Sequence, residues 1–267
     1  RRDGGDFRIL MLTLPDNPTG TVASEDEVRA VCEVAERHGL TIVSDEIYRD
    51  LAHDPAALRS PAELLPQRTF VTTGLSKSMA LGGWRIGFVR LPDGDLGREV
   101  AAPLLGLASE VWSCVAAPIE AAAVHVLEEP DEVVAHVEAA RRLHRCVTTA
   151  AHAHVVAAGA RCRAPQGGFY LYPDLEPARD ALQARGVEDG DALAELLLER
   201  FGIGVLPGSC FGDEPTALRF RMATSLLYGE TDEQRWTALA SEAPAELPWI
   251  RAALDALHDA LVALGRA

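Results

Sequence analysis

The sequence predicts an α/β fold: part of a large domain with a mostly parallel sheet and helices, then a smaller α+β domain. Over the first 90 residues, apolar runs of strand length alternate with helix-like segments, an order typical of parallel sheets. Residues 130–159 contain no internal Pro or Gly, as one long helix requires. Beyond them, strand-like and helix-like segments are mixed. We therefore place the domains at residues 1–145 and 146–267, joined by a long helix near 130–159.

The first predicted strand is the apolar run at residues 8–14, which ends at turn-forming residues 15–20. Residues 24–37 follow as a helix, because Ser24 is a good N-cap and three acidic residues fill the first turn. Gly39 ends it. The expected buried face consists of Val28, Val31, Val34 and Ala35.

Two more predicted strands, residues 40–44 and 69–73, each lead into polar residues, and a further one covers residues 84–90. Asp45 directly follows the first of these three. Open α/β sheets bind ligands at the carboxyl ends of their strands, so we expect the functional residues there. In the second domain we predict strands at 168–172 and 218–223 and helices at 191–201 and 250–265.

Composition limits the function classes. The 267 residues are 48% hydrophobic and carry a formal charge of -15, which argues against a nucleic-acid partner. The five scattered cysteines show no zinc-like spacing, so we expect no metal site. No uncharged apolar run of about 18 residues and no signal-peptide pattern is present, so we expect no membrane association and a cytoplasmic location.

Lysine usage gives a sharper signal. Lys77 is the single lysine among the 25 basic residues. Of these two residue types, only Lys can be deprotonated near neutral pH and condense with a carbonyl group. Chance explains this equally well from composition alone, so the neighbouring motifs decide.

Several motifs occur in a fixed order and together resemble the fold-type I pyridoxal-phosphate enzymes of the aspartate aminotransferase superfamily (class I/II). The motifs are NPTG at 17–20, SDEIY at 44–48, Ser76-Lys77 with GWRIG at 83–87, and Arg219 within LRFRMATS at 218–225. Further matches at 165–175 and 205–212 extend the resemblance over nearly the whole chain. It implies part of the large pyridoxal-phosphate-binding domain followed by the small C-terminal domain.

The resemblance implies that Lys77 is the Schiff-base lysine and that Asp45 favours the protonated ring nitrogen of pyridoxal 5'-phosphate. Asn17 and Tyr48 match the positions that hydrogen-bond to the ring's phenolic oxygen. Alone, Asp45 suits a turn, Asn17 suits the bend before Pro18, and Tyr48 suits a buried aromatic.

Arg85 matches the phosphate anchor, since a guanidinium can hold two phosphate oxygens at once. Ser76 matches a hydroxyl that contacts the same phosphate. Gly74 departs from the pattern, because some family members carry a phosphate-binding Ser there. The hydroxyl of Thr73 is a possible substitute.

Arg219 matches the arginine that binds the substrate's α-carboxylate in a bidentate pair. We assign Arg221 to solvent or to a structural ion pair, with an exchange of the two roles left open. Residues 99–140 contain no Lys or Arg, which argues weakly against an acidic substrate side chain.

The expected function is transfer of an amino group between an α-amino acid and a 2-keto acid, in a homodimer. Alternatives are other chemistry with the same cofactor (C–S lyase, cyclase or oxidase) and a non-catalytic effector domain of a regulator. The family normally has a long stretch before its NPTG-like motif, which begins here at residue 17. We therefore expect a fragment or a truncated gene product, inactive if the missing stretch is essential.

Overall fold

The computed structural model describes residues 5–265, which divide into two compact units. Residues 5–16 and 22–140 form the first unit, and residues 17–21 and 141–265 form the second. The later division falls inside the long helix α5 (Asp131–Ala157), which the sequence predicted as one helix. The short segment 17–21 groups with the second unit although its neighbours in sequence belong to the first.

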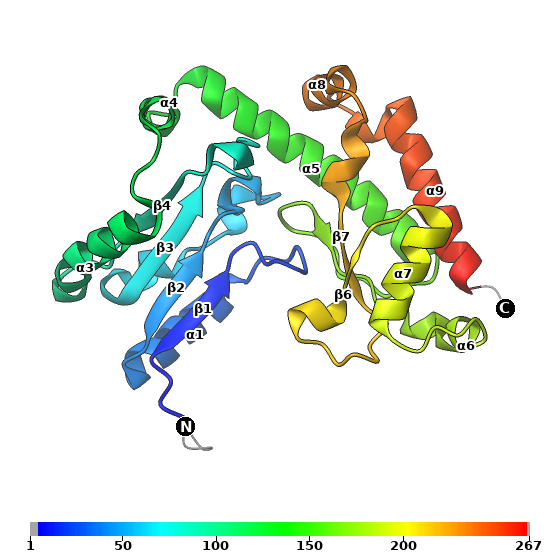
Figure 1. Cartoon of the computed structure of the whole chain (residues 1–267), viewed down its shortest axis with the longest axis horizontal. Coiled ribbons are helices and arrows are strands. Elements are labelled where there is room, and N and C mark those ends of the chain that lie inside the picture. Colours follow the sequence, from blue (N-terminus) through cyan, green and yellow to red (C-terminus); the bar gives the residue numbers. More distant parts are fainter. Residues whose placement is uncertain (1–4, 266–267) are drawn as a thin grey trace. The chain divides into compact units, whose positions relative to one another are not determined.

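The first unit contains a four-stranded sheet in the order β1-β2-β3-β4 (Figure 1). The first three strands are parallel and β4 is antiparallel to β3, which confirms the mostly parallel sheet. Their bounds are Ile9–Thr13, Thr41–Asp45, Thr69–Gly74 and Gly87–Arg90. The predicted start of β4 at Trp84 is wrong. Residues 82–84 form a 3-10 turn, and the backbone of Arg85 is in the left-handed conformation, with a φ of 55°.

Helix α1 (Glu25–His38) lies within one residue of the predicted span 24–37 at each end. Ser24 and Glu27 form a reciprocal capping box, and Gly39 closes the helix in the left-handed conformation. One expected core residue is wrong: Val34 is 40% exposed. The buried positions on α1 instead follow the spacing of one helical face and are Val28, Cys32 and Ala35.

Three other helices of the first unit were not predicted: α2 (Pro61–Leu64), α3 (Asp95–Trp112) and α4 (Ala117–Leu127). Helix α3 contains Pro103 in its interior, together with Gly97 and Gly106. These residues are poor helix formers, so the sequence signal for α3 is weak.

The second unit has a three-stranded antiparallel sheet in the order β5-β7-β6, with bounds Tyr170–Leu171, Phe220–Ala223 and Leu206–Pro207. Its helices after α5 are α6 (Arg179–Gln183), α7 (Gly190–Phe201), α8 (Asp232–Ala240) and α9 (Pro248–Gly265). The sheet and the helices of this unit enclose an apolar core that includes Val147, Leu171, Leu193, Phe220 and Ile250. This unit confirms the smaller α+β arrangement.

No helix within residues 5–265 is both long and apolar enough to cross a membrane.

Candidate active-site residues in the two units

Asp45 is the last residue of β2, and its register partners are Thr13 at the end of β1 and Thr72 in β3. The side chain therefore stands at the carboxyl edge of the parallel part of the sheet, where such sheets bind ligands. One carboxylate oxygen, Oδ1, accepts the backbone N–H of Ile47 at 3.2 Å. This bond shapes the turn after the strand.

Lys77 lies in the loop that follows β3. The loop is closed by a backbone hydrogen bond from Leu81 N to Leu75 O at 3.1 Å, and Leu75 is buried beside Ile86. Lys77 is half-buried, and its Nζ atom lies 5.8 Å from the centroid of the Tyr48 ring. Tyr48 is itself buried. The amine is therefore held against an aromatic face instead of extending into open solvent.

Glu46 is a residue of this region that the sequence analysis missed. It is 1% exposed, and it accepts hydrogen bonds from the hydroxyls of Ser44 (3.0 Å) and Ser60 and from Nη1 of Arg49 (2.8 Å). These bonds fix the backbone on either side of Asp45 and Tyr48. The sequence signal for this interaction is Glu46 followed three positions later by Arg49.

Gly74 has a steric reason to depart from the family pattern. A Cβ atom there would lie 2.8 Å from the carbonyl oxygen of Ile86, across the β3–β4 pair. A Ser at this position therefore requires the strands to shift. The suggested substitute, Thr73, donates its hydroxyl to the carbonyl oxygen of Glu46 at 3.4 Å.

Arg85 and Ser76, the two expected phosphate-binding residues, also belong to the first unit. Arg85 is exposed, and its Nη1 donates to the carbonyl oxygen of Gly82 at 2.7 Å. That partner is neutral, so the bond leaves the positive charge of the guanidinium uncompensated. Ser76 is half-buried immediately before Lys77.

Asn17 and Arg219, the remaining expected site residues, belong to the second unit. The NPTG segment is tied to it by Gly20, whose carbonyl oxygen accepts the backbone N–H groups of Gln166 (2.7 Å) and Gly167 (3.0 Å). Gly20 has a φ of 69°, and a Cβ there would lie 2.4 Å from the carbonyl oxygen of Tyr170. The glycine of this motif is thus required by backbone conformation and by close approach.

Arg219 is engaged with two carboxylates. Its Nε lies 3.3 Å from Oδ2 of Asp174, and its Nη1 lies 3.4 Å from Oδ2 of Asp213. The bond to Asp174 is the main cause that raises the pKa of the Arg219 guanidinium. Tyr172 donates its hydroxyl to the same oxygen of Asp213 at 2.9 Å, and burial followed by this carboxylate raises the pKa of the Tyr172 hydroxyl.

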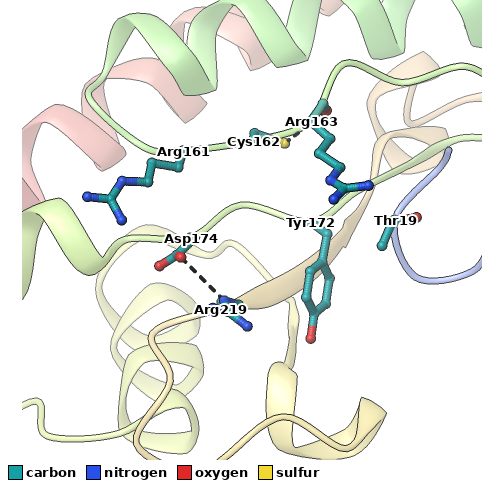
Figure 2. Close-up of a pocket in the computed structure, with 7 residues that line it drawn as sticks. All are labelled: Thr19, Arg161, Cys162, Arg163, Tyr172, Asp174 and Arg219. Carbon is teal, nitrogen blue, oxygen red and sulfur yellow. Dashed lines mark hydrogen bonds and ion pairs between the residues drawn. The ribbon is translucent and has the colours of Figure 1, made fainter.

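A cavity of about 680 Å³ opens beside this network in the second unit. Figure 2 shows Arg161 and Arg163 extending from one backbone segment, with Asp174 and Arg219 facing each other. The lining residues are Thr19, Arg161, Cys162, Arg163, Tyr172, Asp174 and Arg219. The cavity lining combines the guanidinium groups of Arg161 and Arg163 with the ion pair of Arg219 and Asp174, so positive charge is in excess there.

The expectation that Arg221 faces solvent or a structural ion pair is wrong. Its Nη1 donates to Oδ1 of Asn17 at 2.9 Å. Its guanidinium carbon lies 4.5 Å from the Tyr170 ring centroid and 5.0 Å from the Phe211 ring centroid. Residues i and i+2 of a strand point to one face, so Arg219 and Arg221 share a side of the sheet.

Residues 2–226 match the family model described as aminotransferase class I and II. The chain belongs to this family. An aspartate aminotransferase of Geobacillus stearothermophilus is 34% identical to this chain over 233 residues, which are 85% of this chain and 56% of that protein.

Other relatives agree with the family and the fold. An aspartate/prephenate aminotransferase of Cereibacter sphaeroides is 33% identical, over 79% of this chain and 52% of its own. The solved structure of Thermus thermophilus aspartate aminotransferase with maleate is similar at a TM-score of 0.72 and 28% identity, covering 88% of this chain and 56% of that one. The chain thus spans about half the length of these relatives.

An aromatic aminotransferase from Pyrococcus horikoshii gives the same TM-score of 0.72 at 25% identity, covering 93% of this chain and 60% of that one. The α/β aminotransferase fold expected from the sequence is confirmed. The expected site residues divide between the two units: five lie in the first (Asp45, Tyr48, Ser76, Lys77, Arg85) and two lie in the second (Asn17, Arg219).

Proposed function

We propose that the chain is a pyridoxal-phosphate-dependent aminotransferase that moves an amino group between an α-amino acid and a 2-keto acid. The observation that carries the proposal is the position of Lys77. The single lysine of the sequence is half-buried against Tyr48, in the loop after β3. Asp45 stands at the carboxyl end of the neighbouring strand β2.

The donor set of the first unit fits pyridoxal 5'-phosphate. It combines an amine, a carboxylate, a phenol, a hydroxyl and a guanidinium. The guanidinium, that of Arg85, donates a hydrogen bond to the neutral carbonyl oxygen of Gly82. Ser76 and Arg85 would hold the phosphate, Asp45 the ring nitrogen, and Tyr48 the phenolic oxygen. The role of Asn17, which belongs to the second unit, rests on the resemblance alone. When bound, the cofactor supplies an electron sink for negative charge at the substrate's Cα.

The chain's own residues account for binding and proton movement. Lys77 Nζ would hold the cofactor's aldehyde and, once displaced, accept and return a proton at the substrate's Cα. The Tyr48 ring restricts the positions that the Lys77 amine can occupy. Arg219, at the position that the resemblance assigns to it, is the first candidate for the substrate's α-carboxylate.

Aspartate is the first amino acid to test. The relatives from Geobacillus stearothermophilus and Cereibacter sphaeroides are named aspartate and aspartate/prephenate aminotransferases. Their names support an acidic substrate more strongly than the lack of Lys and Arg at 99–140 argues against one. A homodimer is part of the same proposal, and analytical ultracentrifugation tests it.

The experiment is addition of pyridoxal 5'-phosphate to the purified chain and to Lys77→Ala. The wild type should develop a visible absorbance band that the variant lacks, and aspartate with 2-oxoglutarate should give glutamate. An identical band in Lys77→Ala would refute the role of Lys77. Release of ammonia or elimination products without glutamate would favour the other chemistries of this cofactor.

A further inference from the structure

One carboxylate oxygen of the second unit, Oδ2 of Asp213, has two donors beside it. The Tyr172 hydroxyl donates to it at 2.9 Å, and Nη1 of Arg219 lies 3.4 Å away. Charge-assisted bonds from a nitrogen to a carboxylate are usually about 2.7–2.9 Å long, so the contact with Arg219 is a stretched one. The Asp213 carboxylate is therefore held more closely by the hydroxyl than by the guanidinium.

The Tyr172 hydroxyl keeps its proton, so its bond to Asp213 persists at neutral pH. Burial, followed by the hydrogen bond to Asp213, raises the pKa of the Tyr172 hydroxyl above its ordinary value of about 10. A tyrosine hydroxyl has one proton to donate, and here the carboxylate accepts it. Tyr172 and Arg219 both line the cavity of this unit (Figure 2). The path from the hydroxyl to the guanidinium runs through Asp213.

Gly208 leaves the space in which this bond forms. A Cβ atom at Gly208 would lie 2.9 Å from Asp213 Oδ2 and 2.9 Å from the Tyr172 hydroxyl oxygen. The N–H of Gly208 donates to the carbonyl oxygen of Arg219 at 2.8 Å, so the glycine cannot easily move away. Gly208 begins the 3-10 turn 208–211, and close approach, not a left-handed backbone, requires glycine here.

The two carboxylates beside Arg219 leave one of its nitrogens to other partners. Asp174 Oδ2 lies 3.3 Å from Nε and Asp213 Oδ2 lies 3.4 Å from Nη1, so neither contact involves Nη2. If the Asp213 carboxylate moved closer, it would compensate more of the positive charge and weaken the attraction for an incoming anion. The bond from Tyr172 opposes that movement.

We propose that Tyr172 is a positioning residue for substrate binding, because its hydroxyl tethers Asp213 and so keeps Arg219 available for the substrate's carboxylate. The inference rests on the role proposed for Arg219 and names the residues that maintain it. Without the hydroxyl, the Asp213 carboxylate closes on Nη1 of Arg219 and competes with the substrate. Gly208 provides the space that the tether needs.

Maleate is the test ligand, because it is a dicarboxylate with no amino group to transfer. Isothermal titration calorimetry measures its affinity for the purified chain, with and without pyridoxal 5'-phosphate. Tyr172→Phe keeps the ring and removes the hydroxyl, so the affinity should fall about fivefold, the upper range for one half-exposed ion pair between Asp213 and Arg219. Arg219→Met tests the premise and should weaken binding about tenfold or more.

Replacement of Asp213 separates the tether from a direct contact between Tyr172 and the ligand. Asp213→Asn removes the competing charge, so maleate should bind about two- to fivefold more tightly than to wild type. The double variant Tyr172→Phe/Asp213→Asn should therefore bind at least as tightly as wild type, although the hydroxyl is absent. A hydroxyl that touched the ligand, or that only stabilised the fold, would cost the double variant as much affinity as it costs Tyr172→Phe.

Gly208→Ala breaks the tether without removing a polar group. The new Cβ would push the Tyr172 hydroxyl and Asp213 Oδ2 apart, so the affinity should fall as far as in Tyr172→Phe. Gly204→Ala is the matched control in the same unit, because a Cβ there meets no atom within 4 Å, and its affinity should equal that of wild type. Circular dichroism melts verify that each variant is folded at the titration temperature, and the Tyr172 variants decide the outcome if Gly208→Ala is not.

The inference is overturned if Tyr172→Phe binds maleate as tightly as wild type, or if the double variant stays as weak as Tyr172→Phe. It is also overturned if the wild type binds no maleate or if Arg219→Met binds it unchanged. The Lys77-dependent visible band reports separately on the proposed function. A normal band with either of the first two results refutes the tether alone, whereas absence of the band refutes the function and the tether with it.

Discussion

The Nζ atom of Lys77 lies 5.8 Å from the centroid of the Tyr48 ring, which is buried in the first unit. The contact joins the loop after β3 to the turn after β2, the two segments that leave the carboxyl ends of neighbouring parallel strands. Because a cation is attracted to an aromatic face, the ring restrains the position of the amine.

Tyr48 should matter through its ring as well as its hydroxyl. Tyr48→Phe keeps the ring, so the free energy of unfolding should change by less than about 1.5 kcal/mol. Tyr48→Ala opens a cavity and should cost about 3–5 kcal/mol. Urea denaturation followed by circular dichroism measures both, and equal losses in the two variants would show that the ring is not packed as described.

Glu46 should stabilise the turn that carries Asp45 and Tyr48. Glu46→Gln weakens the bond to Arg49 and places a donor among the hydroxyls of Ser44 and Ser60, so a loss of about 1–3 kcal/mol is expected. Glu25→Gln is the matched control, because Glu25 pairs with Arg29 on the surface and should contribute less than about 1 kcal/mol. Similar losses in both variants would contradict a special role for the buried acid.

Introducing at position 74 the Ser that some family members carry should destabilise the protein. In Gly74→Ser the new Cβ lies 2.8 Å from the carbonyl oxygen of Ile86, and overpacking of this kind costs about 1–3 kcal/mol. Gly83→Ser is the control, since a Cβ at Gly83 meets no atom within 4 Å. Chemical denaturation compares the two, and a Gly74→Ser chain as stable as wild type would disprove the close approach of β3 and β4.

The stability of the second unit should fall in alkali. Burial and the Asp213 carboxylate raise the pKa of Tyr172 above the value of about 10 that an unfolded tyrosine has. The folded protein therefore keeps the proton of the Tyr172 hydroxyl at a pH at which the unfolded chain has lost it. This stabilisation is complete below about pH 10 and is lost as the pH rises from there through the folded pKa.

Tyr172→Phe removes this titration, so its melting temperature should decline less steeply above pH 10 than that of wild type. Thermal melts between pH 8 and 11 measure the slope. Tyr228 also has a raised pKa, caused by burial, so some alkaline loss should persist in the variant. Parallel curves for wild type and Tyr172→Phe would rule out a contribution from Tyr172.

Local signals predicted much of the first unit. The helix from Glu25 to His38 is encoded by its own caps, Ser24 and Gly39, and the strands by short apolar runs. These signals depend on neighbours a few residues away, so the sequence contains them in full. Helix α3 was missed because Pro103 lies in its interior, and only tertiary context selects a helix there.

The side-chain contacts of the second unit could not be predicted from the sequence. Arg221 and Asn17 are 204 positions apart. No spacing rule links such residues, and none links Arg219 to Asp174, which lies 45 positions earlier. The charge environment of each guanidinium appears only in the folded chain.

The grouping of residues 17–21 with the second unit has a practical outcome for dissecting the molecule. A single cut within α5 cannot yield the whole second unit, because this unit consists of two separate segments of the sequence. A piece expressed from residue 141 onward would leave the backbone N–H groups of Gln166 and Gly167, and the guanidinium of Arg221, without their acceptors at Gly20 and Asn17. Supplying the NPTG loop as a peptide, or grafting it through a linker, is the route to an autonomous small domain.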